Sequence, residues 1–380
     1  MLRKGTFILM KTKIQDMTSG SPGRLIILFA IPLMLGNICQ QLYTMVDTMV
    51  VGQIAGVEAL AALGAVDFLM WVVTGISTGL TQGFSIQLSQ YYGAKDFENL
   101  RKSLAHSYRL TAFIAAGVLI LSQSFASLVL TGLHTPSNII GMSLLYLRII
   151  FCGIPATAAY NMFASALRAM GNSKTPLTAM IIASVLNVSL DILFVAGFGW
   201  GVAGAAIATV IAQSFSAVYC FLILRRIDIV HLTRADFMPA SGMNARLMKL
   251  GIPVVFQNII IGVGGLVVQY VINGYGFLFV AGFTATNKLY GLLEMAAISY
   301  GYAIVTYVGQ NLGAGKIDRI RKGVRSSMLL SLLTSLIISA AMFLFGKNIL
   351  SLFISGEPQQ TQQVLAIAFK YLSITVSYTH

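Results

Sequence analysis

The chain has 380 residues, of which 57% are hydrophobic and only 10% are charged, and its mean hydropathy is +0.81. Soluble domains carry about 25% charged residues, so this composition excludes a soluble protein and predicts an all-α polytopic membrane protein in a lipid bilayer. The net charge is +13, but the basic residues do not form a cluster interleaved with exposed aromatic residues on a soluble domain. No nucleic-acid partner is therefore expected.

Apolar runs of about 20 residues predict ten membrane-spanning helices. They cover 25–51, 60–86, 105–131, 139–163, 177–196, 204–224, 247–272, 279–303, 324–346 and 361–380. The polar start, residues 1–24, leads into a run that is too long for the apolar part of a cleavable signal. We therefore expect the first run to remain as a span.

The connections between these runs alternate between basic and nearly uncharged segments. Most of the Lys and Arg residues lie in the N-terminal segment and in the connections after the second, fourth, sixth and eighth runs. By the positive-inside rule these connections are cytoplasmic. The sequence thus predicts a multi-pass protein of the cytoplasmic (inner) membrane, with a cytoplasmic N-terminus and odd-numbered spans running outward.

The chain repeats itself after the longest basic connection, residues 225–246. Pro32 and Asn37 recur at the same spacing as Pro253 and Asn258, and the turn Gln-Tyr-Tyr-Gly-Ala after the second run recurs as Gln-Asn-Leu-Gly-Ala after the eighth. An even number of spans separates the copies, so the repeats are parallel. This predicts two six-helix bundles, 25–224 and 247–380, joined by a linker. Twelve spans are expected and about ten are present, so the second bundle would hold four of its six.

Five polar residues of the first half are expected at similar depth in the outer part of the membrane. Asp47 lies near the outer end of the first span, and Asn187 and Asp191 share one face of the fifth. Thr209 of the sixth span and Tyr146 of the fourth lie close to the same level. A carboxylate inside the membrane costs about 3 kcal/mol on insertion scales, so a functional site is the first hypothesis for it.

This set of oxygen-bearing groups suits two kinds of chemistry. Two neighbouring carboxylates repel each other when both are ionised, so one of them can carry a proton. The same oxygens can instead bind a hard monovalent cation such as Na⁺. A third reading is a structural network in which Arg148 of the fourth span pairs with Asp47 or Asp191, or neutralises one of them during a cycle.

Other polar residues within the spans are candidates for a supporting role or a substrate cavity. Gln40 lies on the first span, and Gln257 lies on the seventh, where it either lines a cavity or holds helices together. Lys288 and Glu294 lie on the eighth span at a spacing that does not favour a direct pair. For these two, interfacial snorkelling and a packing hydrogen bond are the structural alternatives.

The sequence resembles the multidrug and toxic compound extrusion (MATE) family of cation-coupled exporters over nearly its whole length. The resemblance rests on the first span, IPLMLGNICQQLYTMVDTMVVGQIAG, and on QYYGAKD, ALRAMGNSKTP and NVSLD after it. It implies two six-helix bundles that open alternately to each side and exchange Na⁺ or H⁺ for amphipathic, often cationic, organic compounds. The family's first-half cation site falls here on Asp47, Asn187, Asp191 and Thr209. Some members carry an acid on the seventh span, where this chain has only amides.

The sequence therefore predicts an antiporter that is not an enzyme, has no cofactor beyond the coupling ion, and acts as a monomer on small organic molecules. Two other functions are alternatives. A lipid-linked oligosaccharide flippase of the same wider superfamily would need a cationic central cavity, and the spans offer few cations beyond Arg148 and Lys288. An intramembrane enzyme would need clustered His or metal-binding carboxylates, whereas the four His residues are scattered.

Overall fold

The computed structural model describes residues 14–133, 135–273, 277–351, 362 and 365–371, and in this part of the chain the regular structure is helical. The α-helices are α1 (Pro22–Ile54), α2 (Val57–Gly64), α3 (Asp67–Gly93), α4 (Phe97–Gly132), α5 (Ile140–Cys152), α6 (Ile154–Ala169), α7 (Lys174–Asp191), α8 (Gly201–Leu224), α9 (Met243–Asn273), α10 (Phe277–Gly313) and α11 (Ile317–Ser351). A π-helical turn, η1 (Ile192–Gly197), follows α7, and two 3₁₀ turns, η2 (Asp228–Val230) and η3 (Arg234–Phe237), lie in the linker.

The described helices confirm an all-α polytopic membrane protein. Seven of them are long and apolar enough to cross a membrane, or eight if the bent pair α5 and α6 forms one span. Each expected span from 25–51 to 324–346 coincides with a helix or a helix pair, and the helices extend beyond the apolar runs. Most of the expected span 361–380 lies outside the described residues. The division at the linker 225–246 stays a prediction.

The fourth span is broken where the sequence places a glycine and a proline. Helices α5 and α6 meet at Gly153 with a bend of 46°. Pro155 has no N–H to continue the hydrogen bonding of α5, which accounts for the bend. A Cβ on Gly153 would lie 2.6 Å from Cγ2 of Val210. The missing side chain therefore lets the corner pack closely against α8.

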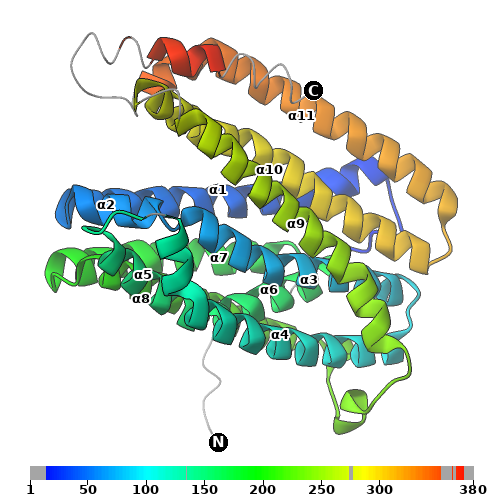
Figure 1. Cartoon of the computed structure of the whole chain (residues 1–380). Helices are drawn as coiled ribbons and strands as arrows, with labels where there is room; N and C mark the ends of the chain where they lie inside the picture. The colour runs from blue at the N-terminus through cyan, green and yellow to red at the C-terminus, as the bar shows by residue number, and fades with distance from the viewer. Residues whose placement is uncertain (1–13, 134, 274–276, 352–361, 363–364, 372–380) are drawn as a thin grey trace, which may run out of the picture.

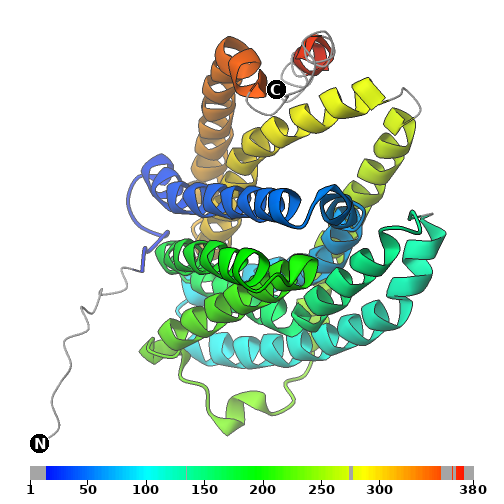
Figure 2. The ribbon, with the colours of Figure 1, turned by 90° about the vertical axis from the view of Figure 1, so that its left-hand side faces the viewer.

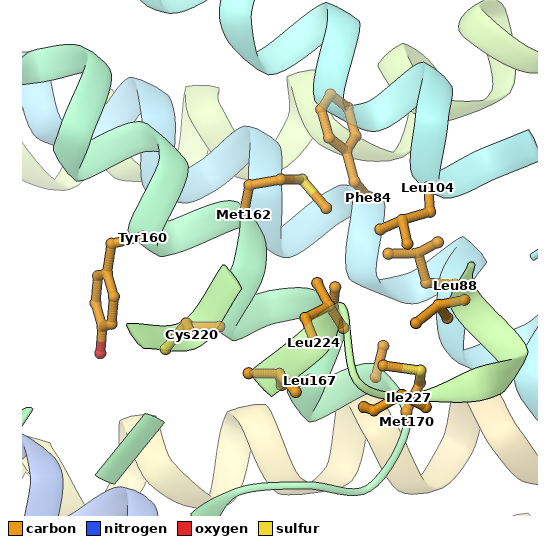
Figure 3. Packing of buried hydrophobic residues seen from close by; sticks show 14 of the residues in the cluster. Phe84, Leu88, Leu104, Tyr160, Met162, Leu167, Met170, Cys220, Leu224 and Ile227 are labelled. Atoms are coloured by element: carbon orange, nitrogen blue, oxygen red, sulfur yellow. The ribbon is translucent and has the colours of Figure 1, made fainter. Parts of the chain in front are cut away.

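The first half is held together by two buried apolar clusters, one above the other along the helices. One joins α3, α4, α6 and α8, with Phe84, Leu104, Met162 and Leu224 among its members (Figure 3). The other lies nearer the opposite end and includes Val51 and Phe151. Burying a large apolar side chain stabilises a fold by about 1.5–3 kcal/mol in water. Within the membrane, close packing rather than hydrophobicity joins the helices.

The two halves meet along α1, α3, α9 and α10, and Figures 1 and 2 both show α9 crossing α3. The repeated asparagines lie in this interface. The amide of Asn37 donates to Oγ of Ser299 at 3.1 Å, and that of Asn258 donates to the carbonyl of Gly75 at 3.0 Å. Each residue therefore bonds to the opposite half, which supports the reading of the seventh-span amides as links between helices.

The two repeated turns also contact each other, at the end of the molecule that carries the basic connections, here called the basic end. A Cβ on Gly93 would overlap the carbonyl of Gln310, and a Cβ on Gly313 would overlap the carbonyl of Gln90. The contact is therefore reciprocal between the repeats. It brings the two backbones so close that only glycine fits at both positions.

An N-terminal segment, residues 14–21, crosses this contact. The Met17 N–H donates to Oε1 of Gln310 at 3.0 Å, and Nε2 of Gln310 donates to the carbonyl of Ala169 at 2.8 Å. Nδ2 of Asn311 donates to the carbonyl of Met17 at 2.9 Å, and Nε of Arg319 donates to Oδ1 of Asn311 at 3.0 Å. The basic end is thus closed by a buried network that joins both halves.

We predict that Gly313→Ala opens the basic end, because the added methyl group cannot fit against the Gln90 carbonyl. The measurement is maleimide labelling of Ser89→Cys in a background without the three native cysteines, since Ser89 is buried in this contact. Labelling should rise clearly over that of the parent. Gly301→Ala is the matched control, because nothing lies within 4 Å of a Cβ at that position on the same helix. Equal labelling in the two variants would contradict the closure.

Candidate cation site

Four helices of the first half bring the predicted residues together. Asp47 lies on α1, Asn187 and Asp191 on α7, Thr209 on α8 and Tyr146 on α5. Helix α7 packs against both α1 and α8, and α8 packs against α5. Asp47, Asp191 and Tyr146 are within electrostatic range of one another. The structure thus places together the polar groups that were selected by depth alone.

The site is built from pairs of residues one helical turn apart, which share a helix face. Asn187 and Asp191 form the pair on α7, and Nδ2 of Asn187 donates to Oγ1 of Thr209 at 3.5 Å. On α8, Gln213 follows Thr209 by one turn, and its Nε2 donates to the hydroxyl of Tyr43 at 3.4 Å. Tyr43 in turn precedes Asp47 by one turn of α1.

Buried side-chain oxygen atoms that lack a hydrogen-bond partner gather in this cluster, which holds five of the ten such atoms among the described residues. Asn187 and Asp191 are 0% exposed and Asp47 is 6% exposed. Within the described residues, no hydrogen bond reaches Oδ1 of Asp47, Oδ1 of Asn187, either carboxylate oxygen of Asp191, or Oε1 of Gln213. An unsatisfied buried polar atom costs about 1–3 kcal/mol, and more when it is charged. Five such acceptors in one place are chemically suited to a cation or a proton.

The backbone changes its helical type directly after Asp191. Helix α7 ends at this residue and the π-helical turn η1 begins at the next one. Single π turns are costly and are frequent at functional sites because they redirect side chains within a helix. Here the turn sets the position of Asp191 relative to α8, against which η1 also packs.

The site residues lie at similar depths along their helices. Asp47 lies seven residues before the end of α1 at Ile54, and Asp191 lies six before the end of η1 at Gly197. Thr209 is eight residues from the start of α8, and Tyr146 is six from the start of α5. These values correspond to about 9–12 Å of helix rise. Helices α1 and α8 extend beyond the apolar runs 25–51 and 204–224, so Asp47 and Thr209 lie deeper along them than those runs indicate.

The alternative in which Arg148 pairs with the acids does not occur in the described part of the chain. Arg148 is exposed on α5, and neither Asp47 nor Asp191 forms an ion pair within the described residues. A purely structural role for the two carboxylates, as ion-pair partners of Arg148, is therefore not supported. Arg148 lines a groove on the outside of the bundle instead.

The remaining candidates lie away from the cluster or outside the description. Gln40 is exposed on α1 and interacts with Tyr43, at the edge of the site. Gln257 on α9 and Glu294 on α10 are exposed in the second half. The side chain of Lys288 lies outside the described residues. The described residues of the second half therefore add no further site.

Tyr43 and Gln213 are site residues that the sequence analysis missed. Both lie inside apolar runs, where a single tyrosine or glutamine is not unusual. The signal that could have found them is their spacing, because each lies one turn from a predicted site residue on its own helix.

The donor set fits Na⁺ or a proton and not a transition metal. Its members are carboxylate, amide and hydroxyl oxygens, which are hard ligands. A search of the described residues finds no group of three or more His, Cys, Asp or Glu that could hold a metal ion. Bound there, a monovalent cation would take Asp47 and Asp191 as its charged partners, with neutral oxygens from Asn187, Thr209 and Gln213.

The fold and this site define a class of membrane protein with a repeated helical bundle and a buried acidic cluster in one half. Comparison with known proteins places the chain more narrowly. The model of the MatE family matches residues 32–193 and 253–379. The chain therefore belongs to the MatE family.

Relatives and solved structures agree with this assignment. The chain is 31% identical to "Probable multidrug resistance protein YpnP" of Bacillus subtilis (strain 168), covering 96% of this chain and 83% of that protein. It is 26% identical to "Probable multidrug resistance protein NorM" of Thermotoga maritima, covering 88% and 72%. A MOP superfamily transporter from Pyrococcus furiosus has the same fold, with a TM-score of 0.89 at 23% identity, over 95% of this chain and 80% of that one.

We predict that Asp191→Asn stabilises the protein in Na⁺-free buffer at neutral pH, because the amide supplies donors to a cluster that has an excess of acceptors. The expected gain is about 1 kcal/mol in the free energy of unfolding. It is measured by thermal unfolding in detergent. Glu98→Gln, which changes an exposed carboxylate at the basic end, is the control and should have little effect. If Asp191→Asn unfolds at a lower temperature than the parent, the cluster is not short of donors.

Proposed function

We propose that this protein is a secondary active exporter that exchanges Na⁺ or H⁺, moving inward, for amphipathic and often cationic organic compounds, moving outward. It would act as a monomer in the cytoplasmic membrane, with its N-terminus and basic connections in the cytoplasm. The names of its relatives, which describe multidrug resistance and multidrug export, support the substrate class. The alternation of basic connections supports the orientation.

The observation that carries the proposal is the group of buried, donor-free oxygens around Asp47 and Asp191. A charge in this position is costly unless something compensates it. A protein whose only task was to hold helices together would satisfy these oxygens with donors. A site that binds and releases a cation in each cycle must instead leave them free of permanent partners.

The closed basic end supports a cycle of alternating access. In this conformation the reciprocal contact of Gly93 and Gly313 and the network around Gln310 join the halves at the basic end. The carboxylates lie nearer the opposite end, about 9–11 Å of helix rise from it. A cation would thus reach them from outside in this state and leave to the cytoplasm when the basic end opens.

Coupling follows from linkage between the two binding events. If the cation binds more tightly to one orientation and the organic compound to the other, each shifts the equilibrium away from the state that the other prefers. Helix α1 is suited to transmit the shift, because it carries Asp47 and also packs against α10 of the second half. Its Asn37 bond to Ser299 belongs to that contact.

We predict that Asp47→Asn abolishes gradient-driven export. In vesicles containing the purified protein, the efflux of a fluorescent cationic dye would be recorded under an imposed Na⁺ gradient and, separately, under a pH gradient. The parent should respond to one of the gradients, which identifies the ion. The variant should lose about tenfold or more of that response, within the range of typical coupling energies.

Glu98→Gln serves as the control for this experiment, since Glu98 is an exposed carboxylate paired with Lys102 on α4. It should transport like the parent. Normal gradient-driven efflux by a correctly folded Asp47→Asn variant would refute the assignment of Asp47 as a coupling residue.

We predict that Gln213→Leu weakens cation dependence without removing it. The substitution leaves both carboxylates in place but removes one buried oxygen and the donor to Tyr43. The cation concentration for half-maximal efflux should rise by about fivefold to tenfold, corresponding to a hydrogen bond of about 1 kcal/mol. Ser214→Ala is the control, because that hydroxyl bonds only to the Val210 carbonyl of its own helix. An unchanged cation dependence would exclude Gln213 from the site.

A further inference from the structure

A groove between α4 and α5 holds Arg148, which the cation site does not use. Its volume is about 640 Å³. Its lining is mostly apolar and consists of Leu119, Ile120, Gln123, Ser124, Arg148, Ile149 and Cys152. It lies on the outside of the first bundle, where the neighbouring side chains Leu121 and Leu145 are also exposed.

Arg148 lies well inside the span. It is eight residues from the start of α5 at Ile140, and Gln123 is nine residues before the end of α4 at Gly132. These positions correspond to about 12–14 Å of helix rise. The hydrocarbon core of a bilayer is about 30 Å thick, so the backbone of Arg148 lies at the level of the acyl chains, with its long side chain able to reach toward the headgroups.

The described residues offer the guanidinium no anion. Gln123 approaches Arg148, but its Nε2 donates to the Arg148 backbone carbonyl at 2.8 Å and to Sγ of Cys152 at 3.2 Å. Neither bond involves the guanidinium, and no ion pair to Arg148 occurs in the described part of the chain. An arginine facing lipid is costly unless it is paired or hydrated. Its natural counter-ion at this place is a lipid phosphate, which the guanidinium can bind through two hydrogen bonds.

We propose that the groove between α4 and α5 is a binding site for an anionic phospholipid, with Arg148 contacting the phosphate and the apolar lining contacting an acyl chain. Charge complementarity selects an anionic lipid over a zwitterionic one, in which the choline or ethanolamine group competes for the phosphate. The groove offers contacts for both parts of such a lipid. Arg148 and Ser124 are available to the phosphate, and the side chains of Leu119, Ile120 and Ile149 are available to the acyl chain.

The test is native mass spectrometry of the purified, delipidated protein with phosphatidylglycerol or phosphatidylcholine of the same acyl chains. The parent should retain phosphatidylglycerol in preference. Arg148→Gln should reduce that preference by about fivefold, the equivalent of about 1 kcal/mol for one basic residue at an anionic lipid. Arg148→Lys should keep most of it. Ile120→Trp, which fills the groove at a side chain that is 65% exposed, should reduce lipid binding while the charge remains.

Two controls separate this site from general charge effects. Arg226→Gln removes an exposed cation at the basic end and should leave the preference unchanged. Excess inorganic phosphate should not displace the lipid, because it lacks the acyl chains. The proposal is overturned if Arg148→Gln binds phosphatidylglycerol like the parent, if Arg226→Gln loses as much, or if inorganic phosphate competes fully. It is also overturned if the parent's Arg148 proves to be covered by a second copy of the chain.

Discussion

The burial of two carboxylates among α1, α5, α7 and α8 is the constraint on which the rest of this structure depends. Each charge would be costly in a membrane, and each lies where the described residues provide acceptors but few donors. The three helices that carry the oxygens must stay close together for one cation to reach all of them. The apolar clusters on either side of the site supply that packing, and the π turn after Asp191 adjusts one ligand without moving its helix.

A second constraint comes from the internal repeat, because the residues that recur are those that join the halves. Asn37 and Asn258 bond across the interface, and Gly93 and Gly313 contact the carbonyls of the opposite repeat. Such contacts have little stabilising area of their own, and hydrogen bonds within membranes are worth about 1 kcal/mol. These small residues and single hydrogen bonds join the halves alongside a buried apolar cluster between α1 and α10, which includes Phe29 and Tyr307.

The helices, the repeat and the grouping of the first-half polar residues could be predicted, because apolar runs, repeated spacings and depth along a span can be read directly from the sequence. Apolar runs fix the spans, and the depth of Asp47 and Asp191 along neighbouring helices brings them together once the topology is known. The ends of the helices were less predictable, since α1 and α8 continue through residues that are not strongly apolar. Tyr43 and Gln213 could not be distinguished from other polar residues without knowing which faces of α1 and α8 meet. The direction in which Arg148 points likewise depends on how α4 and α5 pack, and one of the readings of the sequence placed it toward the acids.

The central claim is that the acidic cluster binds the coupling cation, and equilibrium binding tests it most directly. Radioactive Na⁺ binding and proton uptake would be measured on the purified protein, for the parent and for a variant with both Asp47→Asn and Asp191→Asn. The account predicts saturable Na⁺ binding, or uptake of a proton near neutral pH, in the parent and neither in the folded variant. Cation binding or proton uptake that persists undiminished in the variant would place the coupling site elsewhere and contradict the account.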